Sequence, residues 1–316
     1  MKIKKIFKIL LIVLGCITLA FLILQKMALP GNAPSSPQDM PEKLPLQTAV
    51  SFYPLAFLTE RISGNLAIIT NVTPPGIEPH DFEPTSPDVA KIYGSKLFIF
   101  NGNGVDAWAE KLAPQLENYH VTVIKMSNHI ESLKSGSESE EGSDPHFWLD
   151  PINMSTQTDI IADALIKIDP ANTEDYNKNR AALKLDLAQL DTEYKNGLAN
   201  CQLHEIVTSH NAFAYLAKRY NFNTFHILGL SPEEDPSPKN IAEIIDVAKN
   251  KNIKYIFFET MASPKLSQTI AQEIGATTLV LHPIEGLSGE DISNNKDYLQ
   301  LMRENLTNLR TAMLCK

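Results

Sequence analysis

Apolar residues along the chain form short continuous runs that alternate with longer stretches in which they recur every three or four positions. Because side-chain direction repeats every two residues in a strand and about every 3.6 in a helix, the runs predict buried strands and the stretches predict amphipathic helices. Strands are predicted at residues 48–51, 67–72, 97–101, 121–125, 205–209, 223–227, 255–259 and 277–281. Strands that alternate with helices are typical of α/β proteins with parallel sheets.

Helices are predicted between these strands. They cover residues 53–62, 87–93, 106–116, 151–168, 211–220, 238–250, 264–274 and 294–314. At three of the predicted starts a serine precedes a proline, namely at Ser86, Ser237 and Ser263. A serine side chain can cap free backbone N–H groups at a helix start, and proline fits the first turn. These serines are therefore predicted to be helix caps.

One further stretch, residues 173–198, contains no proline, and its only glycine, Gly197, comes near its end. It predicts a helix of about 25 residues, which is roughly 37 Å long. A chain of 316 residues is long enough for two domains that each bury a core, so two lobes are expected. The long helix is sufficient to cross from one lobe to the other.

The first 29 residues predict a signal peptide or a membrane anchor. Lysines at the start precede an apolar run over residues 9–24 that contains no charge. Residues 13–16 (VLGC) resemble a bacterial lipobox, which would make Cys16 a lipidation site, whereas the apolar residues after Cys16 favour an uncleaved anchor. Both hypotheses place the protein outside the cytoplasm and tether it to the membrane. Residues 30–46 are rich in proline and predict a tether.

The composition, with 43% hydrophobic and 21% charged residues, is that of a folded globular protein. The net charge of -9 argues against a nucleic-acid partner, because phosphate contacts need a clustered excess of lysine and arginine. Beyond Cys16 the chain contains two cysteines, Cys201 and Cys315. In an oxidising compartment this pair predicts one disulfide, with two unpaired buried thiols as the alternative.

Two histidines of the first half lie in loops where α/β proteins bind ligands. His80 lies in a proline-rich loop after the strand at residues 67–72, close to the carboxyl end where such sites form. The alternative is an ordinary surface histidine. His146 precedes two aromatic residues, so its ring is expected to be desolvated, with Asp144 or Asp150 available to orient it. The alternative for His146 is a packed residue that binds nothing.

His210 follows the predicted strand at residues 205–209 and opens a helix, where a helix cap or a catalytic base would also fit. Imidazole is the commonest protein ligand for zinc, and zinc prefers a closed tetrahedral shell. Three histidines at strand ends therefore call for a fourth ligand. His282, Glu285 and Glu259 end or follow predicted strands and are rivals for that position.

Four ordered motifs resemble the metal-binding solute-binding proteins of bacterial zinc and manganese ABC transporters. They are residues 76–84 (GIEPHDFEP), 144–151 (DPHFWLDP), 207–213 (VTSHNAF) and 283–287 (PIEGL). The resemblance covers about residues 48–316. It implies an α/β fold of two lobes, at residues 47–170 and 201–316, each with a four-stranded mainly parallel sheet flanked by helices. One long rigid helix within residues 171–200 is implied to join them, in agreement with the helix predicted above.

The resemblance also implies the metal ligands. His80 and His146 would come from the first lobe, and His210 and an acidic residue from the second. Histidine at the third position favours zinc, because manganese-binding relatives place a carboxylate there and manganese prefers oxygen ligands. Glu285 matches the acidic position of zinc-type relatives. His282 departs from the family pattern, which leaves open whether it supplements or replaces Glu285.

Residues 131–144 also depart from the family pattern. Zinc-type relatives often carry a histidine-rich tract there, whereas this chain carries acidic residues mixed with serine and glycine. We interpret the segment as a solvated flexible loop, with a weak cation collector as the alternative.

The predicted function is that of the extracytoplasmic high-affinity zinc-binding component of an ABC importer. The protein would capture Zn²⁺ between its lobes and deliver it to a membrane permease that works with a cytoplasmic ATPase. A manganese- or iron-binding member of the same fold, with Mn²⁺ as ligand, and a surface metal-binding adhesin are the alternatives. An enzyme is not expected, because a zinc hydrolase keeps one coordination site open for water, and the sequence has no HExxH motif.

Overall fold

The computed structural model describes residues 44–134, 142–232 and 236–316. The predicted signal or anchor segment with Cys16, the predicted tether up to residue 43 and the middle of the acidic loop lie outside the described residues. Within the described ranges, no helix is both long enough and apolar enough to cross a membrane.

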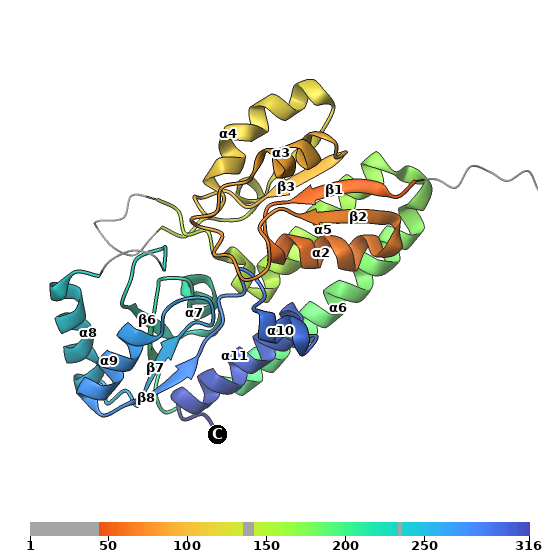
Figure 1. The fold of residues 1–316 in the computed structure, drawn as a ribbon. Coiled ribbons are helices and arrows are strands. Elements are labelled where there is room, and N and C mark those ends of the chain that lie inside the picture. The colour runs from red at the N-terminus through yellow and green to blue at the C-terminus, as the bar shows by residue number, and fades with distance from the viewer. Residues whose placement is uncertain (1–43, 135–141, 233–235) are drawn as a thin grey trace, which may run out of the picture. The chain divides into compact units, whose positions relative to one another are not determined.

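The first sheet contains four parallel strands in the order β2-β1-β3-β4. The inner strand β3 is buried along its whole length, because helices cover both faces of a parallel sheet. Its strands are β1 (Leu46–Val50), β2 (Ala67–Asn71), β3 (Leu97–Phe100) and β4 (Thr122–Lys125), and its helices are α2 (Tyr53–Ser63), α3 (Ser86–Tyr93), α4 (Ala107–Leu116) and α5 (Pro151–Ile168). We call this part the first lobe (Figure 1).

The second sheet repeats this topology, with four parallel strands in the order β6-β5-β7-β8. Its strands are β5 (Glu205–Thr208), β6 (Asn223–His226), β7 (Tyr255–Phe258) and β8 (Thr277–Val280), and its helices are α7 (Ala214–Tyr220), α8 (Pro238–Asn250), α9 (Lys265–Ile274), α10 (Gly289–Ser293) and α11 (Tyr298–Ala312). We call this part the second lobe. The two sheets confirm the predicted fold class.

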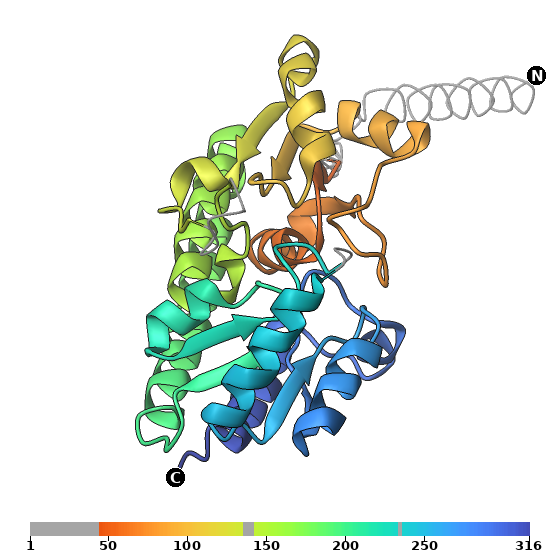
Figure 2. The same ribbon diagram turned by 90° about the vertical axis from the view of Figure 1, so that its left-hand side faces the viewer.

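The long helix α6 (Thr173–Gly197) has 25 residues and joins the lobes, as predicted. It packs against α2 and α5 of the first lobe and against α11 of the second (Figures 1 and 2). Its apolar buried positions are spaced by three, four or seven residues, so they share one face of the helix. They are Tyr176, Leu183, Leu187, Leu190 and Tyr194. Leu185 lies off this face and is 73% exposed.

Two of the three predicted serine caps are wrong. Ser237 does cap α8, since its side chain accepts a hydrogen bond from the backbone N of Asn240. Helix α3 begins one residue earlier than predicted, because Thr85 and Asp88 cap it reciprocally. Helix α9 begins after Pro264 and has no side-chain cap. A serine before a proline therefore marks these starts only to within a residue or two, because proline fits more than one position of the first turn.

Two predicted helices begin later than expected. The last predicted helix, residues 294–314, corresponds to α11, which begins only at Tyr298 because Asp297 and Gln300 form a capping box in front of it. The short helix α10 precedes the predicted range. The helix predicted from residue 211 begins only at Ala214. Residues 211–213 instead continue the loop that carries His210.

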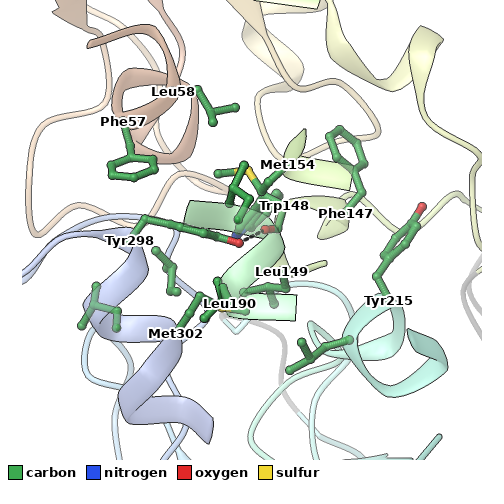
Figure 3. Close-up of a cluster of buried hydrophobic side chains, with 14 of the residues drawn as sticks. Phe57, Leu58, Phe147, Trp148, Leu149, Met154, Leu190, Tyr215, Tyr298 and Met302 are labelled. Carbon is green, nitrogen blue, oxygen red and sulfur yellow. Dashed lines mark hydrogen bonds between the residues drawn. The ribbon is translucent and has the colours of Figure 1, made fainter. Parts of the chain in front are cut away.

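The largest hydrophobic core is shared by the two lobes. Its centre is the fully buried Trp148, whose ring packs edge-on against Phe52 at a centroid distance of 4.9 Å. The Trp148 indole N–H donates to the Pro283 carbonyl oxygen at 2.8 Å. The Tyr298 hydroxyl donates to the Trp148 carbonyl oxygen at 2.7 Å (Figure 3). Smaller separate clusters also exist in each lobe. The expectation that each lobe buries its own core is thus only partly right.

This shared core resists separation of the lobes. Exposing a fully buried large apolar side chain costs about 1.5–3 kcal/mol, and the shared cluster includes Phe57, Tyr298 and Met302 besides Trp148 (Figure 3). Hinge opening of the whole interface would expose several such side chains at once. The two lobes therefore behave as one packed body around their junction.

Cys201 and Cys315 form the predicted disulfide, with a sequence separation of 114 residues. We expect the Cys201→Ser/Cys315→Ser double variant to lose about 2–5 kcal/mol of unfolding free energy, because its unfolded chain is no longer constrained by this loop. Urea denaturation of the oxidised protein and of the double variant measures the difference. Wild type under reducing conditions is the control and is expected to match the variant. Equal midpoints for oxidised wild type and the double variant would contradict the prediction.

Candidate metal centre

Four loop residues meet at the junction of the lobes. His80 lies in the loop after β2, His146 directly precedes the short helical turn Phe147–Leu149, His210 follows β5, and Glu285 lies in the loop after β8. One potential ligand atom from each residue lies within 4.8 Å of those of the other three. The structure therefore brings together the three predicted histidines and one of the three rival residues.

The distances within this group, which we call the His₃Glu cluster, have the size expected for a tetrahedral ion site. Glu285 Oε1 lies 3.4 Å from His80 Nε2, 3.2 Å from His146 Nε2 and 3.5 Å from His210 Nε2. The Nε2 atoms of His146 and His210 are 3.3 Å apart. Bonds of about 2.0–2.1 Å around a tetrahedral zinc ion separate neighbouring ligand atoms by roughly 3.3–3.4 Å. These four separations match the edges of one such tetrahedron.

The cluster is buried, and its converging atoms lack ordinary partners. The side chains of His146, His210 and Glu285 are inaccessible to solvent, and that of His80 is only 8% exposed. Within the part of the chain that the structure describes, both Glu285 carboxylate oxygens and His80 Nε2 lack a hydrogen-bond partner. Each unsatisfied buried polar group costs about 1–3 kcal/mol. A cation bound by all four residues would remove this cost.

His146 is oriented by Asp144, one of the two carboxylates predicted for this role. Asp144 Oδ1 lies 2.8 Å from His146 Nδ1 and also accepts a hydrogen bond from the His146 backbone N. This contact assigns the proton to Nδ1 and leaves the Nε2 lone pair directed into the cluster. Asp150 instead caps α5 through Ile152 N and pairs with Arg219.

Glu259 orients the His210 ring, as Asp144 orients that of His146. Its Oε1 atom lies 2.6 Å from His210 Nδ1 and also accepts hydrogen bonds from the Ser209 hydroxyl and the His210 backbone N. Glu259, a rival for the fourth ligand position, therefore lies on the far side of the His210 ring from the cluster. Its place at the end of β7, the sheet neighbour of β5, is the sequence signal that could have indicated this contact.

His282 is not part of the cluster. Its Nδ1 atom accepts a hydrogen bond from the Ile284 backbone N at 2.9 Å, and its Nε2 atom lies 3.4 Å from Asp291 Oδ2. Both ring nitrogens thus face other groups. Of the three residues that competed for the fourth position, only Glu285 places an oxygen among the histidine nitrogens.

The surroundings shift the pKa values of the three histidines in different directions. Burial alone would lower the pKa of His210, but the Glu259 carboxylate outweighs it and raises the pKa well above the ordinary value. Asp144 similarly outweighs burial and raises the pKa of His146. Burial lowers the pKa of His80. Two of the three imidazoles therefore hold protons more strongly than an ordinary histidine before a metal ion binds.

The carboxylates around the cluster also differ from one another. Burial alone would raise the pKa of Glu285, but the imidazoles of His146, His210 and His80 outweigh it and hold the pKa well below the ordinary value. Sequence reasoning missed Glu78, which accepts a hydrogen bond from the His80 backbone N. Burial, together with the nearby Glu285, raises the pKa of Glu78 to about 9. Glu285 is thus the anionic group that faces the imidazoles.

Residues 49–312 match the model of the ZnuA family, described as zinc-uptake complex component A, periplasmic. The chain belongs to this family. The match confirms the resemblance inferred from the four motifs. The high-affinity zinc uptake system protein ZnuA of Bacillus subtilis (strain 168) is 33% identical over 282 residues, which cover 86% of this chain and 88% of that protein. ZnuA family members are solute-binding components of transport systems.

Solved structures of ZnuA family relatives share the fold. The Zn(II)-bound ZnuA-like domain of Streptococcus pneumoniae AdcA is 34% identical, with a TM-score of 0.76, over 85% of this chain and 99% of that domain. The chain spans 55% of the whole S. pneumoniae AdcA, a zinc-binding lipoprotein. The laminin-binding protein Lmb of Streptococcus agalactiae, described as having adhesin and metal transporting activity, is 34% identical, with a TM-score of 0.78, over 85% of this chain and 100% of that one.

Proposed function

We propose that this protein is the extracytoplasmic zinc-binding component of an ABC importer. It captures Zn²⁺ with His80, His146, His210 and Glu285 and delivers it to a membrane permease that works with a cytoplasmic ATPase. The observation that carries the proposal is the His₃Glu cluster, in which four separations between ligand atoms match the edges of a tetrahedral zinc site. Membership of the ZnuA family and the Zn(II)-bound AdcA relative support zinc as the cargo.

The donor set favours zinc over manganese. Three imidazole nitrogens and one carboxylate oxygen suit a borderline ion such as Zn²⁺, whereas Mn²⁺ is better served by carboxylate, carbonyl and water oxygens. Asp144 and Glu259 add to this preference, because they hold the protons on Nδ1 and make the Nε2 atoms better donors.

The same site favours capture over catalysis. A catalytic zinc site has three protein ligands and one open position for water or substrate. The His₃Glu cluster supplies four protein ligands, which complete a tetrahedral shell and leave no position for a reactive water. The protein is therefore proposed to bind and release zinc without chemical conversion.

Zinc enters from the side of His80, the one member of the cluster with solvent exposure. The hydrated ion loses its water as the four ligands bind it, and the rigid shared core keeps His146 and Glu285 in place. Release then requires a local movement of the His80 loop or contact with the permease. The lipoprotein and periplasmic relatives support a position outside the cytoplasm, with the N-terminal segment as membrane tether.

An adhesin role on the same scaffold is the second candidate, because the Lmb relative is described with both adhesin and metal transporting activity. The two roles share the zinc site and differ in the partner. Loss of zinc uptake in cells that lack the protein, restored by the wild-type chain, supports transport. Unchanged zinc uptake in such cells would instead favour adhesion.

The full-length chain, purified metal-free in mild detergent, is expected to bind one Zn²⁺ and to bind Mn²⁺ at least about a hundredfold more weakly. Competition titration against a chelator of known affinity measures both constants. Metal analysis of the protein as purified from cells provides an independent check. Near-stoichiometric manganese in that sample, or equal affinities for the two ions, would overturn the zinc assignment.

A further inference from the structure

The loop that presents Glu285 contains an uncommon backbone conformation. Ile284, directly before Glu285, has a φ of +58° and is fully buried. A β-branched residue rarely adopts the left-handed region, because its Cβ clashes with the backbone there. Such a conformation persists only where surrounding contacts impose it. The contacts around Ile284 therefore decide where the Glu285 carboxylate points.

The His282 ring supplies the contact closest to this turn. Its Nδ1 atom accepts the hydrogen bond of the Ile284 backbone N–H at 2.9 Å. Its Nε2 atom lies 3.4 Å from Asp291 Oδ2, and Asp291 belongs to the capping box of α10. Because Nδ1 accepts a hydrogen bond and Nε2 faces a carboxylate, the neutral ring carries its hydrogen on Nε2.

The backbone on either side of the ring is clamped as well. Asn305 of α11 accepts a hydrogen bond from the His282 backbone N at 2.7 Å and donates one to the His282 carbonyl oxygen at 2.8 Å. The Pro283 carbonyl oxygen accepts from the Trp148 indole of the first lobe. Contacts from both lobes thus hold His282 and Pro283 in place. The hydrogen bond to Nδ1 in turn holds the Ile284 backbone against the His282 ring.

We infer that His282 is a positioning residue, whose Nδ1 atom holds the left-handed turn that directs Glu285 toward the three imidazole nitrogens. The inference rests on the proposed zinc-binding function and assigns a role to a histidine that lies next to the site without joining it. His282 acts through Glu285 and is not a ligand, because neither ring nitrogen faces the His₃Glu cluster.

Two substitutions at His282 test the roles of the two ring nitrogens separately. In His282→Asn the amide oxygen lies near the place of Nδ1 and still accepts from Ile284 N–H, whereas in His282→Gln the amide group reaches the place of Nε2 and leaves Ile284 N–H unpaired. We expect His282→Gln to raise the zinc Kd by about ten- to a hundredfold, and His282→Asn to stay within about threefold of wild type. Chelator competition with the full-length chain measures these constants.

A double-variant comparison tests whether the effect acts through Glu285. In the Glu285→Gln background, His282→Gln is expected to cause no further loss of zinc affinity, because the group it positions is already altered. A residue with a general structural role would weaken binding equally in both backgrounds, and a residue that binds zinc itself would weaken the double variant further. Either result would overturn the inference.

A measurement on the metal-free protein gives a second readout. The Ile284 amide is expected to exchange with solvent at least about tenfold faster in His282→Gln than in wild type, and at an unchanged rate in His282→Asn. If wild type fails to bind zinc, the proposed function fails and the exchange result still tests the turn. If wild type binds zinc and His282→Gln matches it in both affinity and exchange, only the positioning role is overturned. His282→Asn provides a separate test. A loss of zinc affinity in His282→Asn as large as that in Glu285→Gln would overturn the positioning role.

Discussion

Glu285→Gln is expected to weaken zinc binding by more than about a hundredfold, because loss of a group that merely holds a ligand already costs roughly ten- to a hundredfold. Glu285 Oε1 lies within 3.5 Å of the Nε2 atoms of all three histidines. Glutamine has nearly the same size but no charge, so the change removes the anion from the cluster while leaving the packing in place. Chelator competition with the full-length chain measures the loss.

Glu290→Gln is the matched control for this experiment. Glu290 lies five positions further along the same segment and is exposed at the start of α10. The control is expected to bind zinc like wild type. Unchanged affinity in Glu285→Gln would contradict the assignment of Glu285 as the fourth ligand, and a simultaneous loss in both variants would point to a general effect of the segment's charge.

Zinc affinity is also expected to fall steeply on acidification, beginning above the ordinary histidine pKa of 6.5. The reason is that the pKa values of His146 and His210 are raised in the metal-free protein, so zinc must displace protons that an ordinary histidine would already have lost. Each displaced proton makes the affinity fall by about tenfold per pH unit below the pKa concerned. Two such protons give a decline approaching about a hundredfold per unit.

The stability of the metal-free fold changes with pH in the opposite direction to the zinc affinity. A raised folded-state pKa of His210 stabilises the folded protein at low pH, and this contribution is lost as the pH rises through that pKa. Zinc titrations across the pH range, together with unfolding of the metal-free protein, test both trends. Glu259→Gln removes the main cause of the raised His210 pKa and is expected to move the decline to lower pH. If the zinc affinity of wild type declines only below pH 6.5, the prediction that the raised pKa values of His146 and His210 control it is contradicted.

The strands and the long helix were predictable because local patterns determine them. The buried run that forms β3 and the proline-free stretch that forms α6 carry their periodicity in adjacent residues. The histidines were predictable for a related reason, since carboxyl ends of parallel strands gather at one edge of a sheet. His80 and His210 follow β2 and β5, so topology alone brings each of them to a ligand-binding edge.

Strand ends alone left the fourth member of the cluster open, and the family resemblance singled out Glu285. Glu259 and Glu285 both follow strands of the second sheet, and only the three-dimensional path of the loop after β8 decides which one meets the imidazole nitrogens. That path depends on Ile284, Asn305 and Trp148, which lie far apart in the sequence. The shared core was missed for the same reason, because Trp148 meets Tyr298 only through tertiary packing.

Trp148 gives the protein an intrinsic optical reporter. Its indole is fully buried between the lobes, 5.1 Å from the His146 ring between centroids, whereas the only other tryptophan, Trp108, packs in a separate cluster of the first lobe. Parting of the lobes would move the Trp148 indole from apolar to aqueous surroundings and shift its fluorescence emission to longer wavelength, with little contribution from Trp108. Emission that stays constant through zinc loading and unloading is the spectroscopic signature of a carrier that exchanges its ion through loops alone.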